Sequence, residues 1–150
     1  MTDFPHYYHA SAIAEPDGDV ALESNNLPRL QSAPPEEFGG PGGRWSPETL
    51  LVAAVADCFV LTFRAIARVA KLSWLSLTCE VTGTLDRVER VTSFTSFSLR
   101  ATLDVSAGTN VESARQLLAR AEHACLISAS LKGALAFEPV VRVHELRASA

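Results

Sequence analysis

Three cysteines are the residues of this chain with the clearest capacity for chemistry: Cys58, Cys79 and Cys125. Their spacing is wide and unequal, and no CxxC pair or His-rich tract accompanies them, which argues against a disulfide framework and against a zinc site. They are therefore inert core thiols, or some of them react. A thiol reacts as its thiolate, and an ordinary cysteine with a pKa of about 8.5 is only slightly ionised at neutral pH. A reactive cysteine here needs a group that lowers its pKa.

The three thiols differ in their sequence settings. Cys58 lies in the apolar stretch "SPETLLVAAVADCF", where a small core residue is the plain alternative to a reactive one. The neighbouring Asp57 is expected on another face, because adjacent helical residues diverge by about 100°. Cys125 follows a predicted helix at "EHACLIS", a junction where we expect exposure. Cys79 falls on the apolar face of a predicted strand in which apolar and polar residues alternate, which indicates a small residue that packs in the core.

A long helix must position Cys58. Ser46 offers an N-cap, Pro47 suits the first helical position, and Glu48 falls in the first turn, where the helix dipole favours negative charge. The sequence predicts a helix from here to about Leu72 that is apolar on nearly all sides, so other elements or a partner chain should cover it. A Pro- and Gly-rich loop, residues 33–43, precedes it and is expected to be mobile.

The same apolar run approaches the length of a membrane span. Four charged residues interrupt it, and each is costly in a lipid core: Asp57, Arg64, Arg68 and Lys71. We therefore expect no membrane association.

The remaining pattern predicts an α+β fold. Residues 6–24 form an opening hairpin, and alternation over 74–85 and 97–105 predicts two strands joined by a turn at 86–90. Thr109 and Glu112 suggest a capping box for an amphipathic helix reaching about His123. A short helical turn ended by Gly133 is expected next, and residues 137–146 are predicted to form a closing strand.

Composition limits the function classes. A chain of 150 residues with 47% hydrophobic and 20% charged residues is expected to form one domain, residues 1–150. The net charge is −4 and the thirteen lysines and arginines are scattered, which disfavours nucleic-acid binding. The N-terminal stretch lacks a basic region followed by an apolar core, so we expect a cytoplasmic protein.

Two motifs resemble those of the osmotically inducible and organic hydroperoxide resistance proteins (OsmC/Ohr). In "FGGPGGRWSPETLLVAAVADCF", a Gly-rich loop precedes a Pro-Glu dipeptide, and Cys58 follows Glu48 by ten positions. In "AEHACLISAS", Cys125 and Ser128 match the second motif, with Leu126 where the family usually has proline. The order of elements agrees from about residue 8 to residue 146.

The resemblance implies an OsmC-like fold, with antiparallel sheets around a long central helix in an intertwined homodimer. It implies a thiol peroxidase that reduces organic (alkyl or lipid) hydroperoxides to alcohols without a cofactor or metal. Cys58 would become a sulfenic acid, which Cys125 would convert to a disulfide. It further implies a dithiol reductant, such as a lipoylated protein.

The resemblance also implies an arginine that activates the thiol together with Glu48. In the hydroperoxide-resistance branch this arginine lies in the turn of the first hairpin, but "AIAEPDGDVALE" contains none. Arg29 is favoured as its replacement, because closing the Gly-Pro loop would carry its guanidinium over the thiol, where Glu48 would clamp it. Arg44 is the alternative, although its closeness to Glu48 also fits a surface ion pair.

Two other functions compete with the peroxidase. One is a non-catalytic OsmC-like protein that binds a small molecule or lipid, which an apolar helix would suit equally well. The other is a structural protein whose long helix forms a subunit interface. The thiols discriminate, because only a peroxidase should lose two of them together on treatment with an alkyl hydroperoxide.

Overall fold

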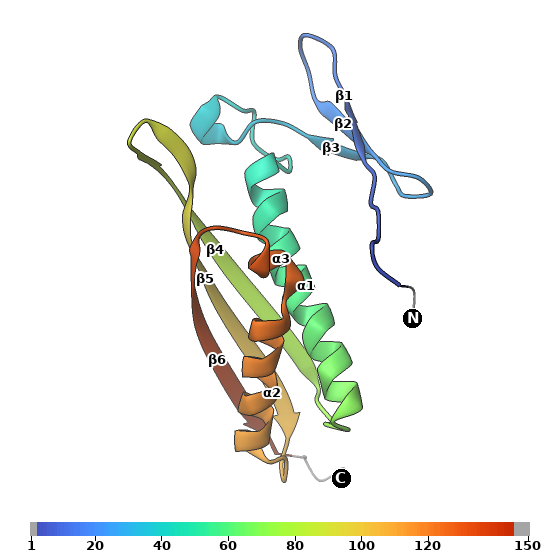
Figure 1. Ribbon diagram of the computed structural model, residues 1–150, viewed down its shortest axis with the longest axis vertical. Coiled ribbons are helices and arrows are strands. Elements are labelled where there is room, and N and C mark those ends of the chain that lie inside the picture. Colours follow the sequence, from blue (N-terminus) through green and yellow to red (C-terminus); the bar gives the residue numbers. More distant parts are fainter. Residues whose placement is uncertain (1–2, 146–150) are drawn as a thin grey trace. The chain divides into compact units, whose positions relative to one another are not determined.

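The computed structural model describes residues 3–145, and the chain divides into two compact units, residues 1–51 and 52–150. The first unit holds a three-stranded antiparallel sheet in the order β1-β2-β3, formed by β1 (Ser11–Ile13), β2 (Val20–Glu23) and β3 (Leu30–Ser32) (Figure 1). The predicted opening hairpin is confirmed by β1 and β2. β3 was not predicted, because three residues are too few to show alternation.

The loop that follows is closed at its base. The amide of Ala33 donates to the carbonyl of Trp45 at 2.9 Å, and a short 3₁₀ helix, η1 (Glu36–Phe38), lies between these ends. Gly40 is required there, because a Cβ at this position would meet the Pro34 carbonyl oxygen at 1.7 Å. The predicted loop is confirmed, and its mobility remains a prediction.

The long helix begins where the sequence predicts. α1 (Pro47–Val69) is capped by Ser46, whose Oγ accepts from the Thr49 amide at 3.1 Å while Thr49 Oγ1 accepts from the Ser46 amide at 2.8 Å. It ends three residues earlier than predicted, because the chain turns through Lys71, which has a φ of 56°. Only one stripe is buried, at four-residue spacing: Val55, Phe59, Phe63 and Ala67.

The second unit contains the other sheet, with strand order β4-β5-β6. β4 (Ser76–Val88) and β5 (Val91–Ser106) form the predicted hairpin, but β4 extends into the predicted turn, which is confined to Glu89 and Arg90. β6 (Ala134–His144) runs parallel to β5, because two helices carry the chain back before it pairs. The predicted last residue of this strand, Leu146, lies outside the described residues.

Those two helices are α2 (Val111–Ala124) and α3 (Leu126–Ala129). The N-cap of α2 is Asn110 rather than Thr109, since the Asn110 side chain accepts from the Ser113 amide at 3.0 Å. The predicted capping box is therefore wrong by one residue. The predicted short helical turn is α3, which is capped at Ser130, before Gly133.

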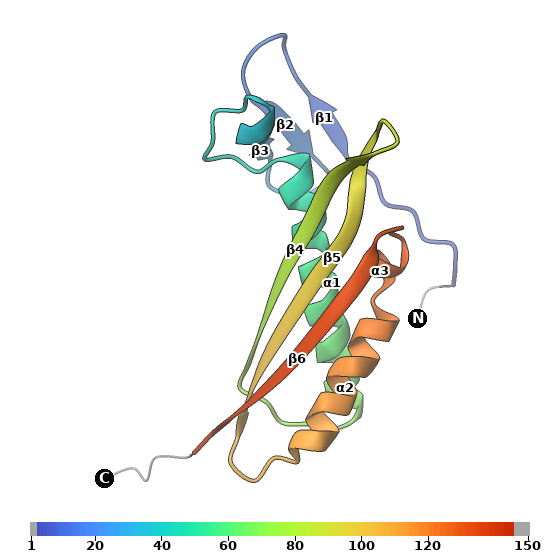
Figure 2. The same ribbon diagram turned by 90° about the vertical axis from the view of Figure 1, so that its left-hand side faces the viewer.

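The core of the second unit lies between the helices and one face of the sheet, with α1 and α2 on the same side (Figure 2). The inward residues of β5 are all buried, as predicted: Phe97, Leu99, Ala101, Leu103 and Val105. α2 contributes Ala114, Leu117, Leu118 and Ala121. Cys125 belongs to this core, and Cys58 and Cys79 pack against it.

A polar row ties the three strands together on the sheet's other face. Asp104, which pairs in register with Ser76 and Arg142, is 7% exposed. Its carboxylate accepts from Arg142 Nε at 2.7 Å and from Ser76 Oγ at 2.9 Å, and it lies 2.8 Å from His144 Nε2. The Arg142 and His144 hydrogen bonds hold the pKa of Asp104 well below its usual range, against an opposing effect of burial.

Among the described residues, α1 is the one helix long and apolar enough to cross a membrane by length and composition. The core helix of a soluble protein can be equally long and apolar. Four residues of α1 are buried and pack in the core of the second unit, and the rest of the helix is partly or fully exposed.

Candidate thiol site

Cys58 lies on α1 beside the buried stripe and is itself half-buried. Its Sγ is 3.9 Å from Oγ1 of Thr62, one helical turn further along. Asp57 is exposed, which confirms that this carboxylate occupies another face. The thiol is thus shielded from water on one side and lies next to a hydroxyl group.

Cys125 joins the second and third helices. It is both the C-cap of α2 and the N-cap of α3, with an extended backbone (φ −68°, ψ 107°). The expected exposure is wrong, because Cys125 is only 1% exposed. The physical reason is that this junction turns the residue into the core rather than toward solvent.

Cys58 and Cys125 come together although they are far apart in sequence. Burial alone would raise the pKa of the Cys58 thiol, but hydrogen bonds to its sulfur outweigh burial, and the pKa is lower than the ordinary value. In decreasing order of effect, the donors are the Ile127 amide, the Cys125 thiol, the Thr62 hydroxyl and the Leu126 amide. The arrangement therefore favours a thiolate at Cys58 with a second thiol beside it.

The pKa of Cys79 is shifted in the opposite direction. Burial raises its pKa to about 12, with smaller contributions from the charges of Cys125 and Glu80. Its packing against the core confirms the predicted position. At neutral pH it is a protonated thiol, so it is a poor nucleophile.

Glu48, the other acidic residue of the motif, lies in the first turn of α1. Its Oε2 is buried and has no hydrogen-bond partner among the described residues. A buried carboxylate oxygen without a donor is costly, so a cation or hydroxyl donor is expected to complete this group.

Neither candidate arginine is that donor in the part of the chain that the structure describes. Arg29 pairs with Glu23, and Arg44 Nε donates to Asp19 Oδ2 at 2.7 Å. The activating role assigned to Arg29, with Arg44 as the alternative, therefore stays a prediction.

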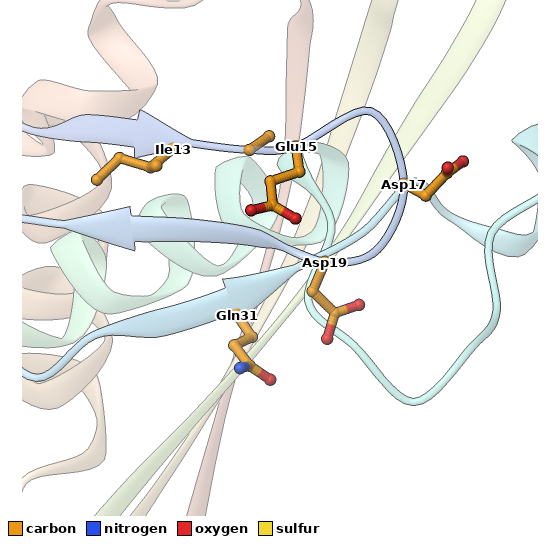
Figure 3. A pocket seen from close by; sticks show the side chains of 6 residues that line it. Ile13, Glu15, Asp17, Asp19 and Gln31 are labelled. Atoms are coloured by element: carbon orange, nitrogen blue, oxygen red, sulfur yellow. The ribbon is translucent and has the colours of Figure 1, made fainter.

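The hairpin of the first unit carries a surface hollow of about 390 Å³, shown in Figure 3. Its lining is mostly polar and includes no cysteine: Ile13, Ala14, Glu15, Asp17, Asp19 and Gln31. Within residues 3–145, no group of three or more His, Cys, Asp or Glu side chains is placed to hold a metal ion. The hollow therefore lacks both the apolar lining and the thiol that a binding site for a hydrophobic peroxide would need.

Sequence reasoning missed three of the donors around Cys58. Thr62 carries a usable signal, because four residues along a helix is one turn. The amides of Leu126 and Ile127 carry none, because every non-proline residue has an amide and only packing decides which one meets the sulfur.

Comparison with known proteins identifies the family of this chain. The chain belongs to the OsmC-like protein family, whose sequence profile matches residues 40–139. It is 26% identical over 136 residues to the uncharacterized protein YmaD of Bacillus subtilis, a match covering 89% of this chain and 90% of that protein.

Solved structures agree with this membership. An organic hydroperoxide resistance protein OsmC from Legionella pneumophila, described as a predicted redox protein, is 28% identical with a TM-score of 0.72, covering 93% of this chain and 98% of that one. An organic hydroperoxide resistance protein from Elizabethkingia anophelis shares the fold at 19% identity and a TM-score of 0.75, covering 95% and 100%. The α+β, OsmC-like fold is therefore confirmed.

Proposed function

We propose that this protein is a thiol peroxidase that reduces organic hydroperoxides to alcohols. One observation carries the proposal: the thiol of Cys125 lies close enough to the sulfur of Cys58 to help lower the pKa of Cys58. Family membership and the likeness to a hydroperoxide resistance protein support a role in peroxide stress. Alkyl and lipid hydroperoxides are the substrates that suit a half-buried thiol beside an apolar core.

The reaction takes three balanced steps. The Cys58 thiolate attacks the distal oxygen of the hydroperoxide, the O–O bond breaks, and the alkoxide takes a proton to leave as an alcohol. The resulting Cys58 sulfenic acid is attacked by the sulfur of Cys125, which forms a disulfide and releases water. An external dithiol, such as a lipoylated protein, then reduces the disulfide and is itself oxidised.

The remaining parts of the proposal concern setting and assembly. We expect a cytoplasmic homodimer in which Glu48 holds an arginine, Arg29 in preference to Arg44, that activates the Cys58 thiol. The buried, unpartnered Oε2 of Glu48 supports a cation at this position.

Single-cysteine variants test the roles of the thiols. Cys58→Ser should abolish consumption of cumene hydroperoxide with dihydrolipoamide as reductant, and Cys79→Ser should keep most of it. Cys125→Ser should consume about one equivalent and stop at the sulfenic acid, because no resolving thiol remains. Hydroperoxide turnover retained in Cys58→Ser would contradict the mechanism.

The alternative is an OsmC-like protein that binds a small molecule or lipid without catalysis. Free thiols counted before and after addition of hydroperoxide separate the two. The peroxidase should lose two thiols together and quickly, whereas the binding protein should lose none on that timescale.

A further inference from the structure

The two sulfurs of the candidate thiol pair differ in their access to solvent. Cys125 is 1% exposed and belongs to the core of the second unit, whereas Cys58 is half-buried and packs against that core. The residues that flank Cys125, Ala124 and Leu126, are both exposed, so the Cys125 side chain turns inward where the chain itself lies at the surface. An external reagent can therefore approach Cys58 and cannot approach Cys125.

The backbone of Cys125 is fixed on both sides, which keeps its sulfur covered. Its carbonyl accepts from the Ala129 amide and from Ser128 Oγ, each at 3.1 Å, and its own amide donates to the Glu122 carbonyl at 3.4 Å. Bringing the sulfur to the surface would need this backbone to rotate, which would break these three hydrogen bonds. Local fluctuation therefore gives an external molecule little access to the Cys125 sulfur.

A disulfide between these two cysteines could be reduced at either sulfur, and two factors favour different ones. A thiolate attacks one sulfur of a disulfide while the other leaves, and the thiol with the lower pKa leaves faster. The lowered pKa of Cys58 therefore favours attack at Cys125. Access favours attack at Cys58 and has the larger effect, because leaving-group strength only scales the rate, whereas a sulfur that no reagent reaches is not attacked at all.

We propose that the reductant attacks the sulfur of Cys58 and that Cys125 is the first leaving group. The attacking thiolate forms a mixed disulfide with Cys58, the bond between Cys58 and Cys125 breaks, and Cys125 takes a proton to become a thiol again. The second thiolate of the reductant then attacks the reductant's own sulfur in the mixed disulfide. Cys58 leaves as a thiolate and the reductant leaves as a disulfide, so two electrons pass from the reductant to the protein.

Peroxide and reductant then use the same sulfur in turn, and Cys125 exchanges bonds only with Cys58. This inference rests on the proposed peroxidase function. It also sets a condition for the single turnover expected of Cys125→Ser. That turnover is measured before a dithiol is added, because a dithiol that reaches Cys58 also condenses with its sulfenic acid.

A reductant with one sulfur blocked tests the proposal, because it can form the mixed disulfide but cannot complete the reaction. The disulfide between Cys58 and Cys125 is first formed with diamide, so that this step needs no peroxidase activity. Singly S-methylated dihydrolipoamide is then added, the mixture is quenched with acid after short times, free thiols are alkylated with N-ethylmaleimide, and the peptides are mapped by mass spectrometry. Nearly all of the adduct should lie on Cys58, with Cys125 recovered as a free thiol. An adduct on Cys125 in equal or greater amount would overturn the proposal.

Two controls separate access from the intrinsic reactivity of the sulfurs. In guanidinium chloride both sulfurs are exposed, so the same reagent should form adducts on both cysteines. Cys79→Ser keeps only the two thiols of the pair and should give the same result as the natural protein, which excludes collection of the adduct by a third thiol. If the unfolded protein keeps the full preference for Cys58, access is not the cause and the proposal fails.

A second measurement needs no disulfide. In the reduced, folded protein, N-ethylmaleimide should alkylate Cys58, and Cys125 should react only on unfolding. Rapid alkylation of Cys125 in the folded protein would contradict the proposal, as would failure of diamide to join the two cysteines. The peroxidase function fails separately, when diamide forms the disulfide and a hydroperoxide does not.

Discussion

At the residue scale, Cys58 and Cys79 show that the pKa of one side-chain type can shift in opposite directions within one unit. Both are partly buried, and burial alone raises the pKa of either thiol. Only Cys58 receives hydrogen bonds that outweigh burial. The direction of the pKa shift therefore follows from the donors at the sulfur and not from burial.

The raised pKa of Cys79 predicts a dependence of stability on pH. Its folded-state pKa of about 12 exceeds the ordinary value of 9.0, so the stability gained by keeping it neutral is complete below pH 9 and is lost as pH rises toward 12. The free energy of unfolding, measured by urea titration, should fall more steeply from pH 9 to 11 in the natural protein than in Cys79→Ala. Parallel curves would contradict this.

At the scale of elements, the start of α1 depends on reciprocal capping by Ser46 and Thr49. Ser46 is 2% exposed, so water does not replace its hydroxyl as the acceptor for the Thr49 amide. The first turn of α1 also holds Glu48. A weakened cap should therefore affect both stability and the placement of that carboxylate.

Ser46→Ala should lower the free energy of unfolding by about 1 kcal/mol, the usual cost of losing an N-cap. Ser46→Thr is the control, because it keeps the accepting oxygen and should lie nearer to the natural protein. Denaturant unfolding followed by circular dichroism measures both. An unchanged midpoint in Ser46→Ala would show that the cap is dispensable.

At the scale of the whole molecule, α1 is incompletely covered within one chain. Leu61 is 51% exposed and Val69 is 83% exposed, on a helix whose composition is typical of a buried one. Large exposed apolar residues on a core helix favour burial by a second copy. This is the physical basis for the proposed homodimer.

Sedimentation equilibrium should therefore give twice the mass of the 16.1 kDa chain. Leu61→Glu should shift the population toward monomer, because a charge buried at an interface without a partner is strongly destabilising. Arg64→Gln, at an exposed and already polar position of the same helix, should not. A well-folded monomer that consumes hydroperoxide would refute the dimeric assembly.

The sequence by itself determined the features that depend on local interactions. Ser46 and Pro47 mark the start of α1, and strict alternation identifies the buried face of β5, because capping and strand periodicity involve residues that are neighbours in the chain. The family motifs marked Cys58 and Cys125 without showing that the two meet.

Tertiary structure alone decided which groups meet. The parallel pairing of β6 with β5 and the contact of α3 with Cys58 both join segments far apart in sequence. Backbone amides look identical in every sequence, so only packing selects Leu126 and Ile127 as donors to the sulfur. The burial of Cys125 has the same cause, since a helix junction is exposed or covered according to what packs over it.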